Sequence, residues 1–261
     1  PFYQAIKINN RQIVKCPLIN QDTSYTIDFE KFETLAKKQE NKLLILCNPH
    51  NPVGRVWQKA ELEKLARICL DNNLILVSDE IHEDLIMPGF KHYPIATLND
   101  EIANITITCT APSKSFNLAG LQGSNIIIRN PDLKNKFILQ QEKRCFHSLN
   151  TMAYEATILA YNKGENWLEK FKKLIAKNYR LLIDFIDQNI PQVKVYPLQG
   201  TYLAWLDFRA FGYSYQELEK KMINANLYLQ LLQSRKIVLD IIQDRNIDLN
   251  VRAVITLKFI D

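Results

Sequence analysis

Two short, continuous apolar runs separated by a helical pattern place the strongest constraint on the fold of this chain. KLLILC (residues 42–47) and LILVS (74–78) have the length and composition of strands buried on both faces. Between them, the spacing of apolar side chains predicts an amphipathic helix over residues 59–72. Strands that alternate with helices are typical of a parallel or mixed sheet with helices on its faces. The sequence therefore predicts an α/β fold.

Each of these apolar runs ends in a polar segment. NPHNPVG (residues 48–54) follows the first run and places Asn51 at its carboxyl end, and DEIH (79–82) follows the second run. Ligands of open α/β sheets bind at this edge of the sheet. Taken alone, Asp79 is more readily interpreted as a cap of the following turn and His82 as a structural histidine, so these alternatives stay open.

A third polar segment surrounds Lys114. TAPSKSFNLAGLQGS (residues 110–124) lies between an apolar, β-branched run at 102–108 and a strand expected at 125–128. Because lysine is mostly exposed, a surface-loop lysine is the ordinary interpretation. A lysine amine on a loop that leaves a sheet can instead be partly desolvated, which lowers its pKa and makes it a nucleophile toward carbonyl groups. The two upstream segments favour this second interpretation.

The remaining periodicity extends the prediction to the whole chain. Towards the amino terminus we expect a helical start, a strand at residues 12–17 and a helix at 28–38. Further on we expect helices at residues 131–145, 152–162, 165–189 and 214–225, and strands at 193–196 and 201–208. These elements predict a large domain (residues 1–160) with a mostly parallel sheet and helices on both faces. A smaller α+β domain is predicted for residues 161–261.

The composition argues against several function classes. The net charge is +5, but basic residues are interleaved with acidic ones, so nucleic acid is not an expected partner. No apolar run approaches the ~20 residues that a membrane span needs, and nothing resembles a signal peptide. Five widely spaced cysteines without a C-x-x-C pair indicate free thiols, and we assign no metal site. We expect a cytoplasmic protein and, because Pro1 replaces an initiator methionine, a fragment or a clipped chain.

Three segments together resemble one family. NPHNPVG (48–54), SDEIH (78–82) and SKSFNLAGLQGS (113–124) are similar, in the same order, to segments of the fold-type-I pyridoxal-phosphate enzymes, aminotransferase class I/II. The closer resemblance is to the cystathionine β-lyase-like C–S lyase branch, which also shares GTYLAWLDFR (200–209). The resemblance covers residues 1–229. It implies a pyridoxal 5′-phosphate cofactor, a small amino-acid substrate and a homodimer of the full-length protein.

The resemblance also implies roles for four residues. Lys114 is implied to form a Schiff base with the cofactor aldehyde. Asp79 is implied to pair with the protonated pyridine nitrogen, because a cationic ring is the better acceptor of carbanion electrons. Asn51 is implied to donate a hydrogen bond to the ring 3′-oxygen. His82 stands where most aminotransferases have a tyrosine that touches the same oxygen, which is typical of the lyase branch.

The resemblance has departures that bear on binding. Ser113 and Gln122 fall where the family holds the cofactor phosphate, but Gln122 replaces the usual arginine. The resemblance begins only after the amino-terminal part of the family, which carries a phosphate-binding loop and an aromatic residue that stacks on the ring. The family's R-x-N-x-A-C-P motif is absent. Arg245 and Arg252 lie outside any such motif, so the substrate carboxylate has no assigned partner.

The resemblance implies a C–S β-lyase that cleaves cystathionine or related cysteine S-conjugates to a thiol, pyruvate and ammonia. Lys114 is then the general base that removes the Cα proton. Two alternatives stay open: an aminotransferase, in which Lys114 moves that proton to the cofactor, and an inactive truncated relic. His82 and the sequence SKSFNLAGLQ (113–122) favour the lyase.

The tail departs from the family in a different way. KIVLDIIQDRNIDL (residues 236–249) lacks the family's pattern and its glycines. Restoring one T in the codon of Leu239 yields IVFGYNTGQEYRF, which resembles the family's F-G-x-x-x-G segment and returns the glycines that a turn needs. A frameshift and a divergent strand and helix both stay open. The frameshift predicts that residues after Val238 pack poorly.

Overall fold

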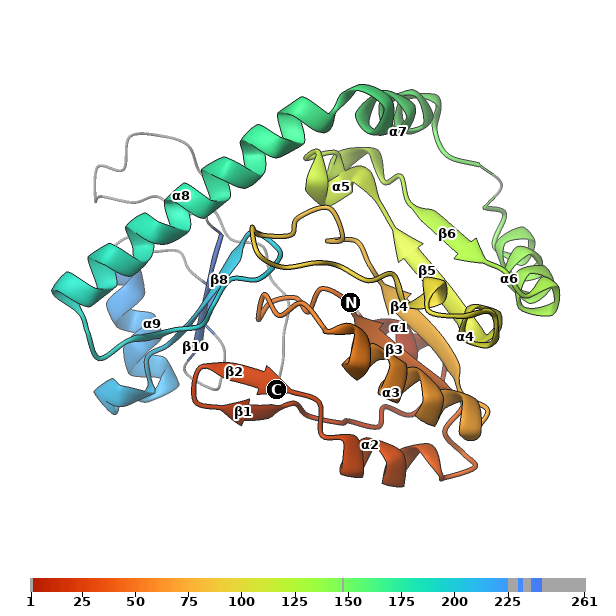
Figure 1. Cartoon of the computed structure of the whole chain (residues 1–261), viewed down its shortest axis with the longest axis horizontal. Helices are drawn as coiled ribbons and strands as arrows, with labels where there is room; N and C mark the ends of the chain where they lie inside the picture. Colours follow the sequence, from red (N-terminus) through yellow and green to blue (C-terminus); the bar gives the residue numbers. More distant parts are fainter. Residues whose placement is uncertain (1, 147, 225–229, 232–235, 241–261) are drawn as a thin grey trace.

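A mixed sheet organises the amino-terminal half of the chain (Figure 1). The computed structural model describes residues 2–146, 148–224, 230–231 and 236–240. The strand order is β3 (Leu43–Cys47), β4 (Ile75–Asp79), β5 (Thr106–Thr110) and β6 (Asn125–Ile128). β3, β4 and β5 are parallel, and β6 is antiparallel to β5. The prediction of an α/β fold with a mostly parallel sheet is confirmed.

The helix α3 (Lys59–Asp71) forms the first hydrophobic core together with the sheet and with α2 (Phe29–Ala36). Its apolar side chains recur at helical spacing, and Leu62, Leu65 and Cys69 are buried. A capping box between Gln58 and Glu61 fixes its amino end. Full burial of each leucine stabilises the fold by roughly 1.5–3 kcal/mol, so this helix is held mainly by packing.

A second, antiparallel sheet lies in the carboxyl-terminal half. Its order is β7 (Lys194–Val195), β8 (Leu203–Asp207), β10 (Lys236–Asp240) and β9 (Gln230–Leu231). A second core joins it to α8 (Glu165–Asn189) and α9 (Tyr215–Asn224). The prediction of a second sheet in this region is confirmed, whereas the domain boundary at residue 160 stays a prediction. No helix among the described residues combines the length and apolar character needed to cross a bilayer.

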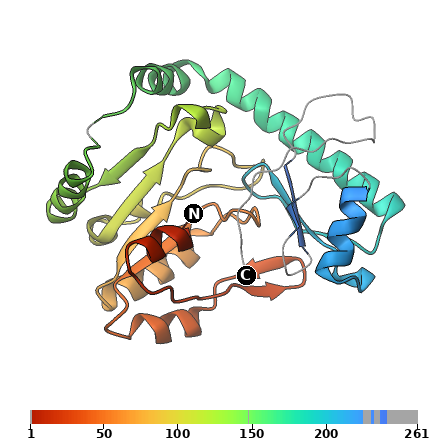
Figure 2. The same cartoon turned by 180° about the vertical axis from the view of Figure 1, so that it is seen from behind.

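A hairpin near the amino terminus lies beside this second sheet (Figure 2). β1 (Ile19–Gln21) pairs with β2 (Ser24–Thr26). The ring of Tyr25 stacks on that of Tyr196 at 5.3 Å, and the Tyr196 hydroxyl donates to the Asn20 side chain at 3.1 Å. This hairpin thus contacts the carboxyl-terminal half of the chain.

Four backbone hydrogen bonds of 2.8–3.0 Å, which we call the backbone seam, join residues 199–201 to two turns of the first half. Two of them form an isolated bridge between Ile86 and Gly200. The hydrogen bonds are Gln199 N–H to Gly54 O, Gly200 N–H to Gly54 O, Thr201 N–H to Leu85 O, and Met87 N–H to Gln199 O. The two turns follow β3 and β4, so the seam fixes the loops at the carboxyl edge of the first sheet.

Replacement of Gly200 with alanine is expected to destabilise the chain by about 1–3 kcal/mol, the usual cost of overpacking. A Cβ atom at this position would lie 2.9 Å from Val56 Cγ2 and 3.2 Å from Pro49 Cβ. Urea unfolding followed by circular dichroism measures the loss. Gly120→Ala is the matched control, because its Cβ would meet nothing within 4 Å; equal stability of the two variants would contradict the prediction.

One predicted strand is wrong, and one apolar, β-branched run is only partly a strand. Residues 12–17 form no strand, and pairing begins only at Ile19, because the described part of the chain offers this segment no neighbouring strand. The run at 102–108 is split: α4 (Asp100–Ile105) occupies its first half, and β5 starts at Thr106. The Asn99 side chain accepts a hydrogen bond from Ile102 N–H at 2.8 Å, and this cap favours the helix over the strand.

The other helices agree with the prediction to within two residues or so, the usual uncertainty of helix ends. They are α1 (Phe2–Ile8), α6 (Pro131–Lys143), α7 (Thr151–Lys163) and the α8 and α9 already given. Short 3₁₀ turns, η1 (Ile95–Thr97), η2 (Ala119–Leu121) and η3 (Arg209–Phe211), and the single helical turn α5 (Pro112–Ser115) complete the described elements.

The tail is described only in part. β10 pairs with β8 in the register Val238 to Trp205 and Asp240 to Leu203, so strand pairing continues past the proposed frameshift position. Arg245 and Arg252 lie outside the described residues. The frameshift therefore stays a prediction.

Candidate functional site

Three of the predicted site residues follow the carboxyl ends of three neighbouring parallel strands. Asn51 lies just beyond β3, Asp79 ends β4, and Lys114 lies just beyond β5. The register places Cys47 opposite Asp79 and Asp79 opposite Cys109, so the three strands end level with one another. Since parallel strands present their carboxyl ends at one edge, the topology brings these segments to a common edge of the sheet.

Asp79 is almost fully buried, with 7% of its surface exposed. Its backbone carbonyl accepts from Asn48 N–H at 2.9 Å, and its Oδ1 accepts from Ile81 N–H at 3.3 Å. The turn-capping alternative is therefore present in the structure. One such bond uses only part of a carboxylate, which has about four acceptor sites, so the capping contact does not preclude a second partner.

Asn51 lies half-buried in the turn after β3. Its amide oxygen is buried and has no hydrogen-bond partner among the described residues, and the same holds for His50 Nδ1. Buried polar atoms are nearly always paired, so unpaired ones indicate a place for a polar group of a ligand. The amide oxygen and nitrogen exchange places by rotation of the side chain, so Asn51 offers either an acceptor or a donor there. The residues at this edge therefore fit a polar cofactor.

His82 lies in the turn that follows Asp79. It is buried, and its ring meets that of Tyr202 edge-on, with centroids 5.9 Å apart. The turn is closed by the hydrogen bonds from Glu83 N–H to Glu80 O and from Leu85 N–H to His82 O. Tyr202 was not singled out as a site residue from the sequence. It directly follows the backbone seam, which holds it next to this turn.

Lys114 and Ser113 lie in α5 (Pro112–Ser115), a single helical turn at the place where the sequence predicts a loop. Both side chains are half-buried. Gln122 caps η2 in a left-handed conformation with φ 57°, and its side chain is exposed. The structure thus places Lys114 and Ser113 together and leaves Gln122 on the surface of the same loop. The phosphate-binding role of Ser113 and Gln122 stays a prediction.

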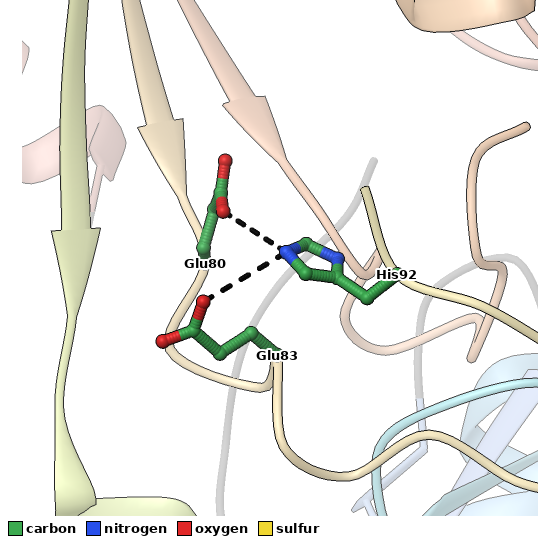
Figure 3. Close-up of side chains that lie close together, drawn as sticks. All are labelled: Glu80, Glu83 and His92. Carbon is green, nitrogen blue, oxygen red and sulfur yellow. Dashed lines mark hydrogen bonds and ion pairs between the residues drawn. The ribbon is translucent and has the colours of Figure 1, made fainter. Parts of the chain in front are cut away.

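Sequence reasoning missed a buried carboxylate–imidazole cluster beside Asp79 (Figure 3). Glu80 is fully buried, and its Oε2 lies 2.9 Å from His92 Nε2. Its Oε1 accepts from the Ser78 hydroxyl at 2.7 Å and from Ile95 N–H at 3.1 Å. Glu83 Oε2 lies 3.8 Å from the same imidazole nitrogen, so the ring points between the two carboxylates (Figure 3).

This cluster is the one group of three metal-ligating side chains that lie close together in the described part of the chain. Both oxygens of Glu80 already have partners, so the contacts describe a buried hydrogen-bond network. Asn48 adds to it by donating its side-chain N–H to Tyr93 O at 3.2 Å. The segment around His92 is thus hydrogen-bonded to the residues that directly follow β3 and β4.

Glu83 carries an unusual pKa in this cluster. Burial, followed by the charges of Asp84 and Glu80, raises the pKa of Glu83 from 4.5 to about 7, and His92 opposes the shift. A raised carboxyl pKa means that the folded state holds a proton that the unfolded chain has released. The contribution of protonated Glu83 to the free energy of unfolding is therefore fully present below pH 4.5. This contribution is lost as the pH rises through about 7.

Glu83→Gln is therefore expected to stabilise the chain above pH 7 and to change little near pH 4.5, since glutamine resembles the protonated acid. Urea unfolding at pH 5 and at pH 8 measures the difference. Glu101→Gln, an exposed residue of α4, is the matched control. A Glu83→Gln effect that is independent of pH would contradict the raised pKa.

Two further groups near the strand ends are held neutral by burial. Burial lowers the pKa of His50 to about 4, with help from the Arg55 charge. Burial raises the pKa of the Cys109 thiol to about 11, with smaller contributions from Asp79 and Glu80. All five cysteines are free, as expected. Neither His50 nor Cys109 is ionised near neutral pH.

A separate cavity of about 750 Å³ lies between α8 and the segment after the Asp79 turn. Met87 and Phe90 contribute apolar side chains, and Lys173 and Arg180 of α8 contribute charge. None of the predicted site residues lines it. The cavity therefore does not define the site at the sheet edge.

Comparisons with known proteins agree with this geometry. The sequence profile of the family described as aminotransferase class I and II matches residues 1–238. The chain is 44% identical over 223 residues to the cystathionine beta-lyase PatB of Bacillus subtilis (strain 168), covering 85% of this chain and 58% of PatB.

Two solved structures share the fold. Cystalysin from Treponema denticola, whose crystal structure contains a pyridoxal 5′-phosphate cofactor, matches with a TM-score of 0.90 and 41% identity over 92% of this chain and 63% of cystalysin. The C–S lyase from Staphylococcus hominis, also bound to this cofactor, matches with a TM-score of 0.82 and 32% identity over 92% of this chain and 62% of the lyase.

The chain spans less than two thirds of the length of each of these three proteins. Within that span, the family profile covers the strands, the polar segments at their ends and most of the second sheet. The chain belongs to the aminotransferase class I and II family.

Proposed function

We propose that this chain is part of a pyridoxal-phosphate-dependent C–S β-lyase that cleaves cystathionine or related cysteine S-conjugates to a thiol, pyruvate and ammonia. The observation that carries the proposal is the arrangement of Asn51, Asp79 and Lys114 at the ends of three parallel strands. The Bacillus subtilis relative, called a cystathionine beta-lyase, supports the choice of reaction. Both bound structures named above support the choice of cofactor.

In this proposal four residues act on the cofactor and substrate. When bound, the cofactor withdraws electrons and so stabilises negative charge at the substrate Cα. Lys114 anchors the cofactor through its amine and, once released, takes the Cα proton. Asp79 keeps a proton on the pyridine nitrogen by its negative charge. Asn51 and His82 orient the ring through its oxygen substituent.

The surrounding chain supports these roles. Burial of Asp79 strengthens its interaction with a cation, because opposite charges attract more strongly away from water. The edge-on contact between His82 and Tyr202 restrains the imidazole. Ser113 and Gln122 are proposed to contact the phosphate, with Gln122 the weaker candidate because its side chain is exposed and uncharged. No metal takes part in the proposed reaction.

The proposal extends to the assembly and its location. We propose a cytoplasmic homodimer of the longer protein, acting on a small amino acid, with neither nucleic acid nor membrane as a partner. Residues 1–160 are proposed to hold the cofactor, and residues 161–261 to form the smaller domain. The first hydrophobic core lies within residues 1–160, and most of the second comes from residues 161–261, which supports this division; Val53, Leu85 and Met87 join the second core from the first part.

Pyruvate formation from cystathionine tests the reaction. The chain is mixed with pyridoxal 5′-phosphate and cystathionine without any keto acid, and pyruvate is measured with lactate dehydrogenase. Continuous pyruvate release is expected of a lyase. An aminotransferase would release no pyruvate; it would instead convert an added keto acid to the matching amino acid and leave the carbon–sulfur bond intact. A relic would do neither and would show no new visible absorption band with the cofactor.

A further inference from the structure

The helical turn that carries Lys114 is too short to hold its own orientation. α5 spans Pro112–Ser115, and its closing bonds are Phe116 N–H to Pro112 O at 2.9 Å and Leu118 N–H to Ser113 O at 3.1 Å. The first turn of a helix fixes several dihedral angles for one hydrogen bond, so an isolated turn is unstable. Contacts outside the turn must therefore fix the direction of Lys114.

Ser115 supplies such a contact. Its side chain is fully buried, and its hydroxyl donates a hydrogen bond to Asp84 Oδ2 at 2.7 Å. A hydroxyl–carboxylate bond of this length is charge-assisted and roughly twice as strong as a neutral one. Successive residues of a helix point about 100° apart. Anchoring Ser115 therefore sets the direction in which the neighbouring Lys114 leaves the turn.

The other end of this contact is itself fixed. Asp84 belongs to the turn after Asp79, which is closed by the bond from Leu85 N–H to His82 O at 3.0 Å. Leu85 is fully buried, and its carbonyl accepts from Thr201 N–H in the backbone seam. Asp84 is thus held in the turn that carries Asp79 and His82, which lies thirty residues before α5 along the chain.

We propose that Ser115 and Asp84 are positioning residues, which hold the Lys114 amine at a fixed place relative to Asp79 by joining α5 to the turn after β4. The proposal rests on the proposed function, in which Lys114 attacks the cofactor aldehyde. Neither residue touches the reacting atoms. Their effect reaches the reaction through the orientation of Lys114.

Reductive labelling tests the proposal without a need for turnover. The chain is incubated with pyridoxal 5′-phosphate, reduced with borohydride and digested, and the pyridoxyl group on each lysine peptide is followed by mass spectrometry. We expect Ser115→Ala and Asp84→Ala each to slow labelling of Lys114 by about tenfold, since small displacements of a nucleophile are costly. Labelling of surface lysines should not change.

Conservative and control variants separate positioning from general damage. Ser115→Thr keeps the hydroxyl and should label Lys114 close to the wild-type rate. The double variant should be no slower than either single one, because the two residues act through one bond. Ser148→Ala, an exposed serine outside the site, should behave as wild type.

The outcomes distinguish this proposal from the proposed function. If the wild-type chain takes no label at Lys114, the proposed function fails. If the wild type is labelled there and Ser115→Ala is labelled equally fast, even with a lower melting temperature, the positioning role is overturned. If Ser115→Ala does not fold, Asp84→Ala decides: slower labelling of a folded variant supports the role, and an unchanged rate overturns it.

Discussion

Lys114→Ala is expected to abolish both covalent cofactor labelling at this position and turnover of every substrate. The variant removes the amine that anchors the cofactor and the base that takes the Cα proton, so no step of the proposed reaction remains. The half-buried position of Lys114 at the end of β5 predicts that the rest of the fold is retained. Peptide mapping after borohydride reduction, together with the pyruvate assay, measures both losses.

Lys134→Ala is the control for this experiment. Lys134 is exposed on α6, away from the strand ends, so its removal should change neither labelling nor activity. Pyridoxyl label on another lysine of the wild-type chain, with Lys114 unmodified, would contradict the assignment of Lys114 as the cofactor-binding lysine.

Asp79→Asn is expected to lower the rate of Cα deprotonation on the order of 100-fold, comparable to the loss of one preorganised electrostatic contact. Cofactor binding should weaken much less, because asparagine preserves the shape of the side chain. Asparagine is also a good cap, so the bond from Ile81 N–H can persist. Exchange of the substrate Cα proton with deuterium, followed by NMR, isolates this step.

This substitution separates the two interpretations of Asp79. If Asp79 only caps its turn, Asp79→Asn keeps near-normal exchange, since the cap survives. If its charge supports the pyridine nitrogen, exchange falls while the melting temperature is nearly unchanged. Asp132→Asn, an exposed carboxylate in α6, is the matched control.

Much of the fold and the candidate site could be predicted from local patterns. The apolar runs that became β3 and β4 fixed the parallel strands, and the polar segments after them placed Asn51 and Asp79 at one edge. Lys114 was assigned to the same edge for the same reason. These placements succeeded because a buried strand and the point where it ends can both be recognised within one short stretch of sequence, as an apolar run followed directly by polar residues.

The contacts between distant segments could not be predicted in this way. Glu80 and His92 are twelve residues apart, and Asp84 and Ser115 are thirty-one apart, with no periodic pattern that connects them. Their pairing depends on how three strands align. The split of residues 102–108 into α4 and β5 was missed for a local reason, because the Asn99 cap competes with the β-branched composition.

Residues 199–201 are hydrogen-bonded to both loops that carry site residues, and this attachment limits how the protein can open. Separating β8 from the turns after β3 and β4 requires four backbone hydrogen bonds to break together. Any relative motion of the two sheets is therefore expected to be smallest near Gly200 and to grow with distance from that point along α8. The amide protons of Gly200 and Thr201 are accordingly expected to exchange with solvent as slowly as those in the middle of β4.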